Sequence, residues 1–226
     1  DSAHAEAFGM LADHYRSRGL AQDEARVLAA WSGPADDDTA IAHRRRLTAL
    51  HMDELGQPER ALQLLEDDLG TTVTDEDLMA RAERLYAHFE RYEDLVSLYK
   101  SALDQDGATD EARIELLAKL AQVAEIQLED LDAAREAALS LVEIDPKHAF
   151  AMGSLERVAR LTGNWDDLDR AFALQLDITH EDGARAALLL ERGETALRRL
   201  QRPDEALAAA EEADALIGDG EALDRL

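Results

Sequence analysis

Apolar residues recur along this chain at a spacing of three or four positions. In one stretch Met152, Leu155 and Val158 precede a short polar turn, and Leu168 and Phe172 follow it. Side chains at this spacing share one face of an α-helix, so both sides of the turn have the pattern of an amphipathic helix. The stretch therefore predicts two helices joined as an antiparallel hairpin.

The hairpin pattern is repeated along the sequence. Each copy has a polar turn, then an acidic residue or pair, then a small or apolar residue within the following helix. The copies read GQPERA (56–61), ERYEDL (90–95), EDLDAA (129–134), GNWDDL (163–168) and QRPDEA (201–206), with a weaker copy, LAQDEA, at 20–25. Their last residues are separated by 36, 34, 39, 34 and 38 residues. Because one hairpin cannot bury its apolar face while stacked neighbours can, the repeats predict a stack of about six hairpins.

Alternate copies resemble one another more closely than adjacent ones do. Tyr92 and Trp165 stand in the turns of two copies, and Pro58 and Pro203 stand in the turns of two others. The prolines suit the first turn of a helix, where a missing N–H is tolerated. Copies two apart are offset by 70, 73, 73 and 72 residues, which indicates a larger unit of two hairpins.

The predicted hairpins form a single repeat domain that spans residues 1–226. They cover about 3–32, 40–70, 76–105, 110–144, 148–178 and 183–217. Residues 218–226 are predicted to begin a further or capping helix. Since the sequence begins at Asp1, we expect a processed chain or a piece of a longer one.

The repeats resemble the tetratricopeptide repeat family. The resemblance rests on the turn from Gly163 to Asp167 and on Pro146, which follows a helix. It also rests on a bulky residue four positions after the last residue of a copy, as at Leu65, Tyr99 and Phe172. It implies an all-α fold, a right-handed superhelical stack of about six antiparallel hairpins. It also implies that the first helices of the hairpins line a concave surface and that the second helices form the convex one.

Composition agrees with an all-α fold and excludes several other classes of protein. Hydrophobic residues make up 46% of the chain, whereas 12 Gly and 4 Pro are few for the many turns of an all-β fold. The net charge of −26 repels nucleic acid and anionic membranes, so neither is an expected partner. The longest stretch without a charged residue, Val27 to Ala35, is too short to span a membrane.

The sequence offers no catalytic, cofactor-binding or metal-binding motif. It has no Cys and no HExxH, and no Lys follows a Gly as it does in phosphate-binding loops. His51 and Glu54 lie one helical turn apart, but a solvated helix surface explains such a pair better than a metal site does. Trp165 and Phe172 are expected to pack one hairpin on another. We therefore expect a protein that is not an enzyme and that has no cofactor.

Charge is distributed unevenly between the predicted helices. The first helices of the hairpins together carry a net charge of +2, so the remainder carries −28. Basic residues at offsets that face the predicted concave surface are the candidate partner-binding residues: His43, Arg46, Arg81, Arg84, His88, Lys119, Arg157, Arg160, Arg192, Arg198 and Arg199. Arg binds carboxylates with two parallel hydrogen bonds, so these residues fit an acidic or C-terminal peptide. The alternative is that they are solvated residues paired with acids on adjacent turns.

The predicted function is a non-catalytic scaffold that binds a protein or peptide along its concave face. A carboxylate clamp made from Lys, Arg and two Asn is disfavoured, because the chain has a single Asn, Asn164, in a turn. The alternative function is a structural segment of a larger repeat protein that self-associates through the ends of the stack. The expected compartment is the cytoplasm, with export after removal of a signal peptide as the alternative.

Overall fold

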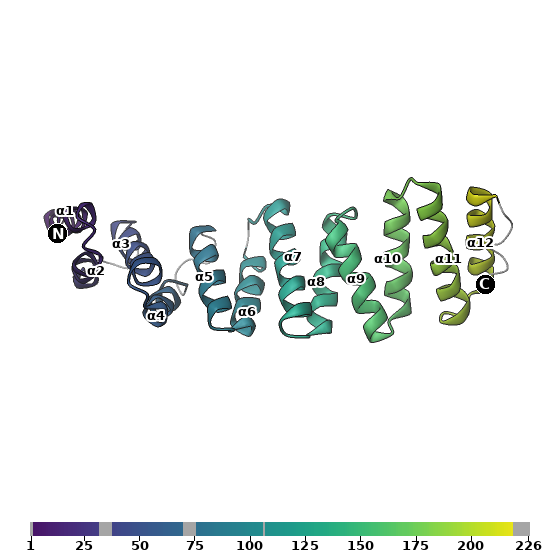
Figure 1. Cartoon of the computed structure of the whole chain (residues 1–226), viewed down its shortest axis with the longest axis horizontal. Helices are drawn as coiled ribbons and strands as arrows, with labels where there is room; N and C mark the ends of the chain where they lie inside the picture. Colours follow the sequence, from purple (N-terminus) through teal and green to yellow (C-terminus); the bar gives the residue numbers. More distant parts are fainter. Residues whose placement is uncertain (1, 32–37, 70–75, 106, 219–226) are drawn as a thin grey trace. The chain divides into compact units, whose positions relative to one another are not determined.

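The computed structural model describes residues 2–31, 38–69, 76–105 and 107–218 (Figure 1). Within these ranges all regular secondary structure is helical and no strand occurs. The prediction of an all-α stack of helical hairpins is confirmed. The further helix predicted from residue 218 falls on residues 219–226, which lie outside the described ranges.

Residues 1–105 form the first of two compact units. Its helices are α1 (Ser2–Ser17), α2 (Ala21–Ala30), α3 (Asp38–Ala49), α4 (Pro58–Leu69), α5 (Glu76–His88) and α6 (Tyr92–Leu103). A short π-helix, η1 (Leu50–Glu54), continues α3. Each odd-numbered helix packs against the even-numbered helix that follows it, which gives three hairpins.

Residues 106–226 form the second unit. Its helices are α7 (Asp110–Ile126), α8 (Leu131–Ile144), α9 (Ala149–Thr162), α10 (Trp165–Ile178), α11 (Asp182–Arg198) and α12 (Pro203–Ile217). They pair as three more hairpins, and α9 contacts α7 as well as α8 and α10. None of the helices in the described ranges has the length and apolar character needed to cross a membrane.

The helices begin where the sequence supplies a cap or a proline. Asp130 and Asn164 each accept a hydrogen bond from the backbone N–H three residues on, at 3.0 and 3.3 Å, which satisfies a free donor of the first turn. Thr109 does the same before α7. Pro58 and Pro203 are the first residues of α4 and α12, as the sequence predicted.

Each hairpin turn contains one residue in the left-handed conformation. Three of these residues are glycines, Gly19, Gly56 and Gly163, which adopt positive φ at little cost. The same conformation is adopted by Glu90, Glu129 and Gln201, with φ of 55°, 52° and 56°. Because a side chain disfavours this region, the three non-glycine turns are strained.

Two kinds of turn alternate along the chain. In the first kind, the residue after the left-handed position donates its N–H to a carbonyl five residues back, as Asn164 does to Ala159 at 3.0 Å. In the second kind, the carbonyl lies six residues back, as in Asp130 to Ala124 at 2.9 Å. The first kind closes the α1–α2, α5–α6 and α9–α10 turns, and the second closes the other three. One extra residue in every second turn is therefore a structural basis for the two-hairpin period in the sequence.

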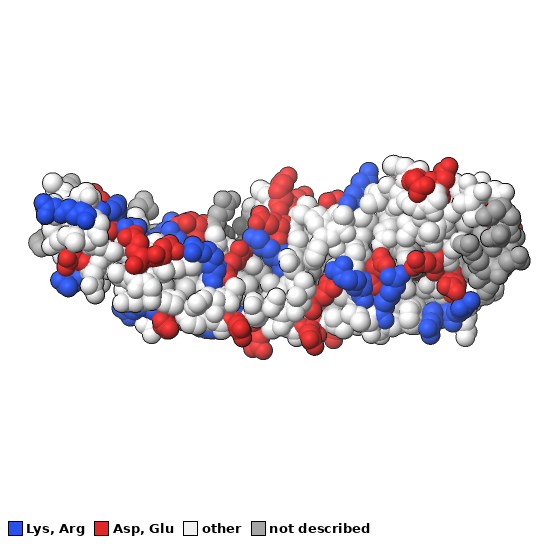
Figure 2. Space-filling view, viewed as in Figure 1, with Lys and Arg blue, Asp and Glu red and all other residues white. Residues whose placement is uncertain are grey.

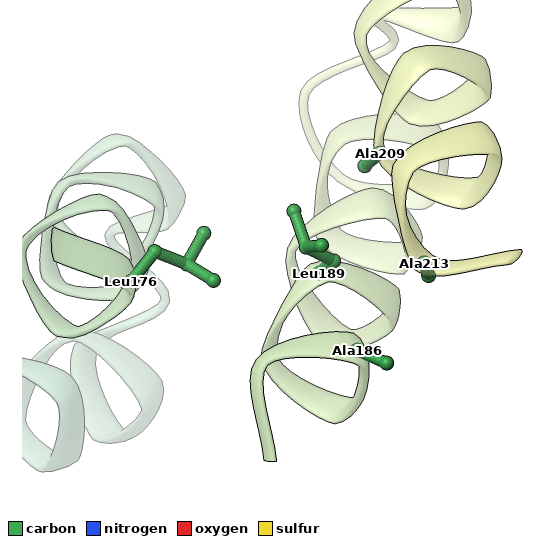
Figure 3. Packing of buried hydrophobic residues seen from close by; sticks show 5 residues of the cluster. All are labelled: Leu176, Ala186, Leu189, Ala209 and Ala213. Atoms are coloured by element: carbon green, nitrogen blue, oxygen red, sulfur yellow. The ribbon is translucent and has the colours of Figure 1, made fainter. Parts of the chain in front are cut away.

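Alanine and leucine build the core at the end of the second unit. Leu176 of α10 points toward α11, whose Ala186 and Leu189 lie between α10 and the α12 residues Ala209 and Ala213 (Figure 3). All five side chains are buried. Small side chains at three- and four-residue spacing let α11 and α12 approach closely, so that even an alanine-rich helix is held in the stack.

Candidate functional site

The exposed sides of the first helices are the surface on which the sequence placed its candidate residues. This surface, called the first-helix face below, comprises α1, α3 and α5 in the first unit and α7, α9 and α11 in the second. Ten of the eleven candidates lie on these helices, and Arg199 is the residue that ends α11. The face is described separately for each unit.

In the first unit, Arg46 binds a buried carboxylate rather than pointing to solvent. Its Nε and Nη2 donate to the two oxygens of Glu24 at 2.8 and 2.9 Å, and Arg16 adds a third hydrogen bond at 2.9 Å. Glu24 is 1% exposed. Burial alone would raise the pKa of Glu24, but the hydrogen bonds from Arg46 and Arg16 outweigh it, and the pKa lies below its ordinary value. The cluster joins α1, α2 and α3.

The two arginines of α5 connect that helix to the hairpin before it. Arg81 donates to the backbone carbonyl of Arg45 and to Asp77, the latter at 2.7 Å. Arg84 donates to Asp53 at 2.9 Å, and both side chains are about half exposed. Both arginines therefore bind carboxylate or carbonyl oxygens of this chain.

The two histidine candidates of the first unit make aromatic contacts. His43 packs edge-on against Trp31, with ring centroids 5.8 Å apart. His88 packs in the same manner on Phe89 at 4.9 Å and is exposed. His88 is therefore the more accessible of the two.

In the second unit, Glu125 holds α7 and α9 together. Its oxygens accept from Arg157 Nε and Nη2 at 2.7 and 3.0 Å and from Ser154 Oγ at 2.7 Å. Burial would raise the pKa of Glu125, yet the hydrogen bonds from Arg157 and Ser154 lower it overall. The partner Arg157 keeps 51% of its side chain exposed.

The remaining basic candidates on the helices of the second unit are also paired. Arg160 donates to Glu156 and, at 2.6 Å, to Glu191 of α11. Arg192 binds Asp169 of α10 at 2.6 and 3.3 Å. Lys119 and Arg198 form ion pairs one turn back along their own helices, at 2.8 and 2.9 Å.

Arg199 contacts an aromatic ring. Its guanidinium lies over the ring of Trp165, 4.6 Å from the centroid, at the α11–α12 turn. Trp165 is half buried, whereas Phe172 is 1% exposed in the core between α9 and α10. A guanidinium stacked on a ring gains cation–π attraction, so Arg199 binds the aromatic of a neighbouring hairpin.

The first-helix face therefore carries charge pairs rather than a row of free cations. Figure 2 shows basic side chains next to acidic ones over α3 to α5 and again over α9 to α11. Five of the acids that bind these arginines lie 22 to 32 residues away in the sequence, for example Glu24 for Arg46 and Glu125 for Arg157. Only the stacking of the hairpins brings such partners together.

A shallow apolar hollow on α7 was not predicted from the sequence. It has a volume of about 360 Å³ and lies between α7 and the start of α9. Its lining residues are Glu111, Ile114, Glu115, Ala118, Lys119, Gln122, His148 and Phe150. The signal was present in the spacing: Ile114 and Ala118 lie beside the buried Leu117 and Ala121 on α7, so the apolar side of this helix is wider than its buried part.

No cluster of three metal-ligating side chains occurs among the residues that the structure describes. His51, which lies one helical turn from Glu54, has its Nδ1 2.9 Å from the side-chain oxygen of Gln57. This contact holds the ring at the η1–α4 turn, and it involves Gln57 rather than Glu54.

Residues 151–186, which span most of α9 and all of α10, match the tetratricopeptide repeat family. No curated protein matches the chain. Among solved structures, a tetratricopeptide repeat protein from Parabacteroides merdae is 16% identical, covers 98% of this chain and 87% of its own, and superposes with a TM-score of 0.50. PilF of Pseudomonas aeruginosa is 13% identical, with coverage of 96% and 94% and a TM-score of 0.43. The family match identifies residues 151–186 as a tetratricopeptide repeat, and the first of these structures shows that the chain has a similar fold, in agreement with the resemblance seen in the sequence.

Proposed function

We propose that this chain, a stack of tetratricopeptide-type hairpins, is a non-catalytic scaffold that binds a protein or peptide along its first-helix face. Proteins of this repeat family are in general scaffolds for protein–protein interaction. The observation that carries the proposal is the direct contact of the first helices α7 and α9, which exposes one continuous surface with an apolar hollow and charged edges. Such a surface offers an extended partner segment many contacts at once.

Three arginines of this face are the proposed contacts for acidic groups of the partner. Arg84, Arg157 and Arg198 keep 60%, 51% and 59% of their side chains exposed, although each is paired with a carboxylate of this chain. A guanidinium has five N–H donors, and a single carboxylate occupies only some of them. The remaining donors of each arginine can bind an acidic group of the partner. Exposed ion pairs contribute only about 0–1 kcal/mol, so exchanging one carboxylate for another costs little.

The experiment is capture of partner proteins from an extract of the source cells with matched charge reversals. Arg84→Glu and Arg198→Glu change the first-helix face, and Arg26→Glu and Arg170→Glu make the same change on the second helices α2 and α10. All four arginines are more than 40% exposed and pair with acids of this chain, so the four variants should fold equally well. We expect partners to be lost with the first two variants and retained with the last two. The opposite result would place binding on the second helices.

Self-association is the second candidate function. It is favoured by apolar side chains exposed on the first hairpin, where Met10 is 74%, Leu11 43% and Leu20 42% exposed. Exposed apolar residues that cluster are typical of contact surfaces. The solution mass at low and at high protein concentration decides between the two candidates, because a scaffold for other proteins stays monomeric at both.

A further inference from the structure

Helix α1 exposes a position that lies in the core of later hairpins. Hairpins with the first kind of turn are aligned by the residues whose carbonyls close it, which are Tyr15, Tyr86 and Ala159. Four positions before them stand Leu11 of α1, Ala82 of α5 and Leu155 of α9. Ala82 and Leu155 are fully buried, and Leu155 packs on Ala138 of α8, the second helix of the hairpin before it. Leu11 is 43% exposed, so it holds the place of a residue that a preceding second helix covers.

Met10 holds a position that reaches the preceding first helix in later hairpins. One counterpart is Arg81 of α5, which donates to the backbone carbonyl of Arg45 of α3. The other is Ser154 of α9, which donates to Glu125 of α7 at 2.7 Å. Met10 is 74% exposed. The outer side of α1 is therefore one half of the junction that joins a hairpin to the hairpin before it.

The hairpin α11–α12 exposes the other half of such a junction. Hairpins with the second kind of turn are aligned by the residues whose carbonyls close it, which are His51, Ala124 and Ala196. Eleven positions after them stand Leu62 of α4, Arg135 of α8 and Leu207 of α12. Leu62 is 9% exposed, and Arg135 binds Asp167 of the following hairpin. Leu207 is 49% exposed, although its place is one that a following hairpin covers.

The alternation of the two turns makes these two halves fit each other. The hairpins α5–α6 and α9–α10 have the first kind of turn, and each follows a hairpin with the second kind. The hairpin α11–α12 has the second kind, and α1–α2 has the first kind. A second copy whose α1 packs on α11 and α12 therefore repeats a junction that the chain already makes twice.

This junction between copies brings apolar residues of α11 and α1 together. Inside the chain, the position of Met10 contacts two positions on the preceding first helix, those of Arg45 and Glu125. On α11 the same two positions are Leu190 and Leu197, both half-buried. The junction places these leucines and Met10 where the internal junctions have polar contacts, and burial of the apolar side chains favours association.

An ion pair of the internal junctions is repeated with its charges exchanged. Arg84 of α5 donates to Asp53 of α3 at 2.9 Å. The position of Arg84 is taken by Asp13 in α1, and the position of Asp53 is taken by Arg198 in α11. Asp13 and Arg198 each form an exposed ion pair one turn away on their own helix, at 3.1 and 2.9 Å. Such pairs contribute little to stability, so Asp13 and Arg198 of two copies can bind each other at little cost.

We propose that copies of this chain associate head to tail, with α1 of one copy packed on α11 and α12 of the next. The occupant is a second copy because the two faces match in the kind of turn, in apolar residues and in charge. Such an interface uses a different surface on each copy, so further copies can add at both ends. The inference rests on self-association, the second of the proposed functions, and specifies its surfaces.

The first measurement is the mass of the purified full chain in solution, by sedimentation over a range of protein concentrations. We expect the mean mass to rise with concentration. A net charge of −26 repels a second copy, so association should be stronger at about 500 mM than at about 50 mM NaCl. A monomer under all these conditions overturns both this inference and self-association, and it leaves the scaffold function standing.

Variants that block one face each identify the mode of association. Leu11→Glu blocks the α1 face and Leu207→Glu blocks the α12 face, and both leucines are more than 40% exposed, so the variants should fold. Each variant alone should associate about 10-fold more weakly, because a charge enters the apolar contact. Mixed together they should form a one-to-one dimer and nothing larger, since each retains the face that the other has lost. Leu161→Glu, the matched change of an exposed leucine on α9, should associate like the natural chain.

A charge exchange tests the alignment of the two faces. Asp13→Arg should weaken association several-fold, and adding Arg198→Asp to the same chain should restore it. Circular dichroism checks that each variant is helical. If Leu11→Glu prevents association and Leu207→Glu does not, identical α1 faces pair, which overturns the inference and leaves self-association standing. Association that neither leucine variant affects, or a mixture of the two that stays monomeric, also overturns it.

Discussion

Replacing Glu24 with glutamine tests the charge cluster that joins the first two hairpins. Glu24 is 1% exposed and accepts three hydrogen bonds, two from Arg46 and one from Arg16. Gln keeps the shape and one acceptor oxygen, but it places an NH₂ group against a guanidinium that has only donors. At least one charge-assisted hydrogen bond is therefore lost.

The size of the effect follows from burial. A hydrogen bond to a charged group contributes about 1.5–3 kcal/mol, and breaking a fully buried ion pair costs about 3–5 kcal/mol. Arg16 and Arg46 keep 47% and 28% of their side chains exposed, so water replaces part of what they lose. We therefore expect Glu24→Gln to lower the free energy of unfolding of the first unit by about 2 kcal/mol, near the lower end of these ranges.

The assay is urea unfolding followed by circular dichroism, with Asp23→Asn as the matched control. Asp23 is the neighbouring acid, but its partner Arg26 is 77% exposed, so the control should lose less than about 0.5 kcal/mol. If Glu24→Gln loses no more than Asp23→Asn, the cluster contributes nothing to stability, and the reasoning from burial is refuted.

The pH dependence gives a second readout of the same cluster. The folded-state pKa of Glu24 lies below its ordinary value, so ionised Glu24 stabilises the fold above the unfolded pKa of about 4.3. That contribution is lost as the pH falls through the lowered folded-state pKa. The stability difference between the natural chain and Glu24→Gln should therefore be full at pH 7 and shrink below about pH 4.3.

Three other outcomes are expected from the structure. Phe172→Ala should cost about 3–5 kcal/mol in urea unfolding, because the ring is fully buried, and Trp165→Ala about half as much, because that ring is half buried under Arg199. Gln201→Gly should raise the unfolding free energy by about 0.5–1 kcal/mol, since φ is 56° there; an unchanged midpoint would mean that the turn is not strained. Raising NaCl from about 20 to about 500 mM should raise the melting temperature, because ions screen the repulsion of a net charge of −26. A fall would show that the arginine–acid pairs outweigh that repulsion.

The amino-acid sequence determined the class of fold, the pairing of helices into hairpins and the starts of several helices. Local signals were sufficient for this: Pro58 and Pro203 begin α4 and α12, and Asn164 caps α10. The family match at residues 151–186 also falls on the copy of the repeat that carried the resemblance, around Trp165. These features depend on neighbours within a few residues, which a single sequence displays directly.

The tertiary structure decided what the charged and apolar residues of the first-helix face do. Periodicity placed Arg46 and Arg157 on that face, but it could not show that Glu24 and Glu125 would bind them, because each pair joins different helices across 22 and 32 residues. It likewise left open that Ile114 and Phe150 border one hollow. Which side chains meet between stacked hairpins depends on the register of one helix against the next, and packing across the whole unit sets that register.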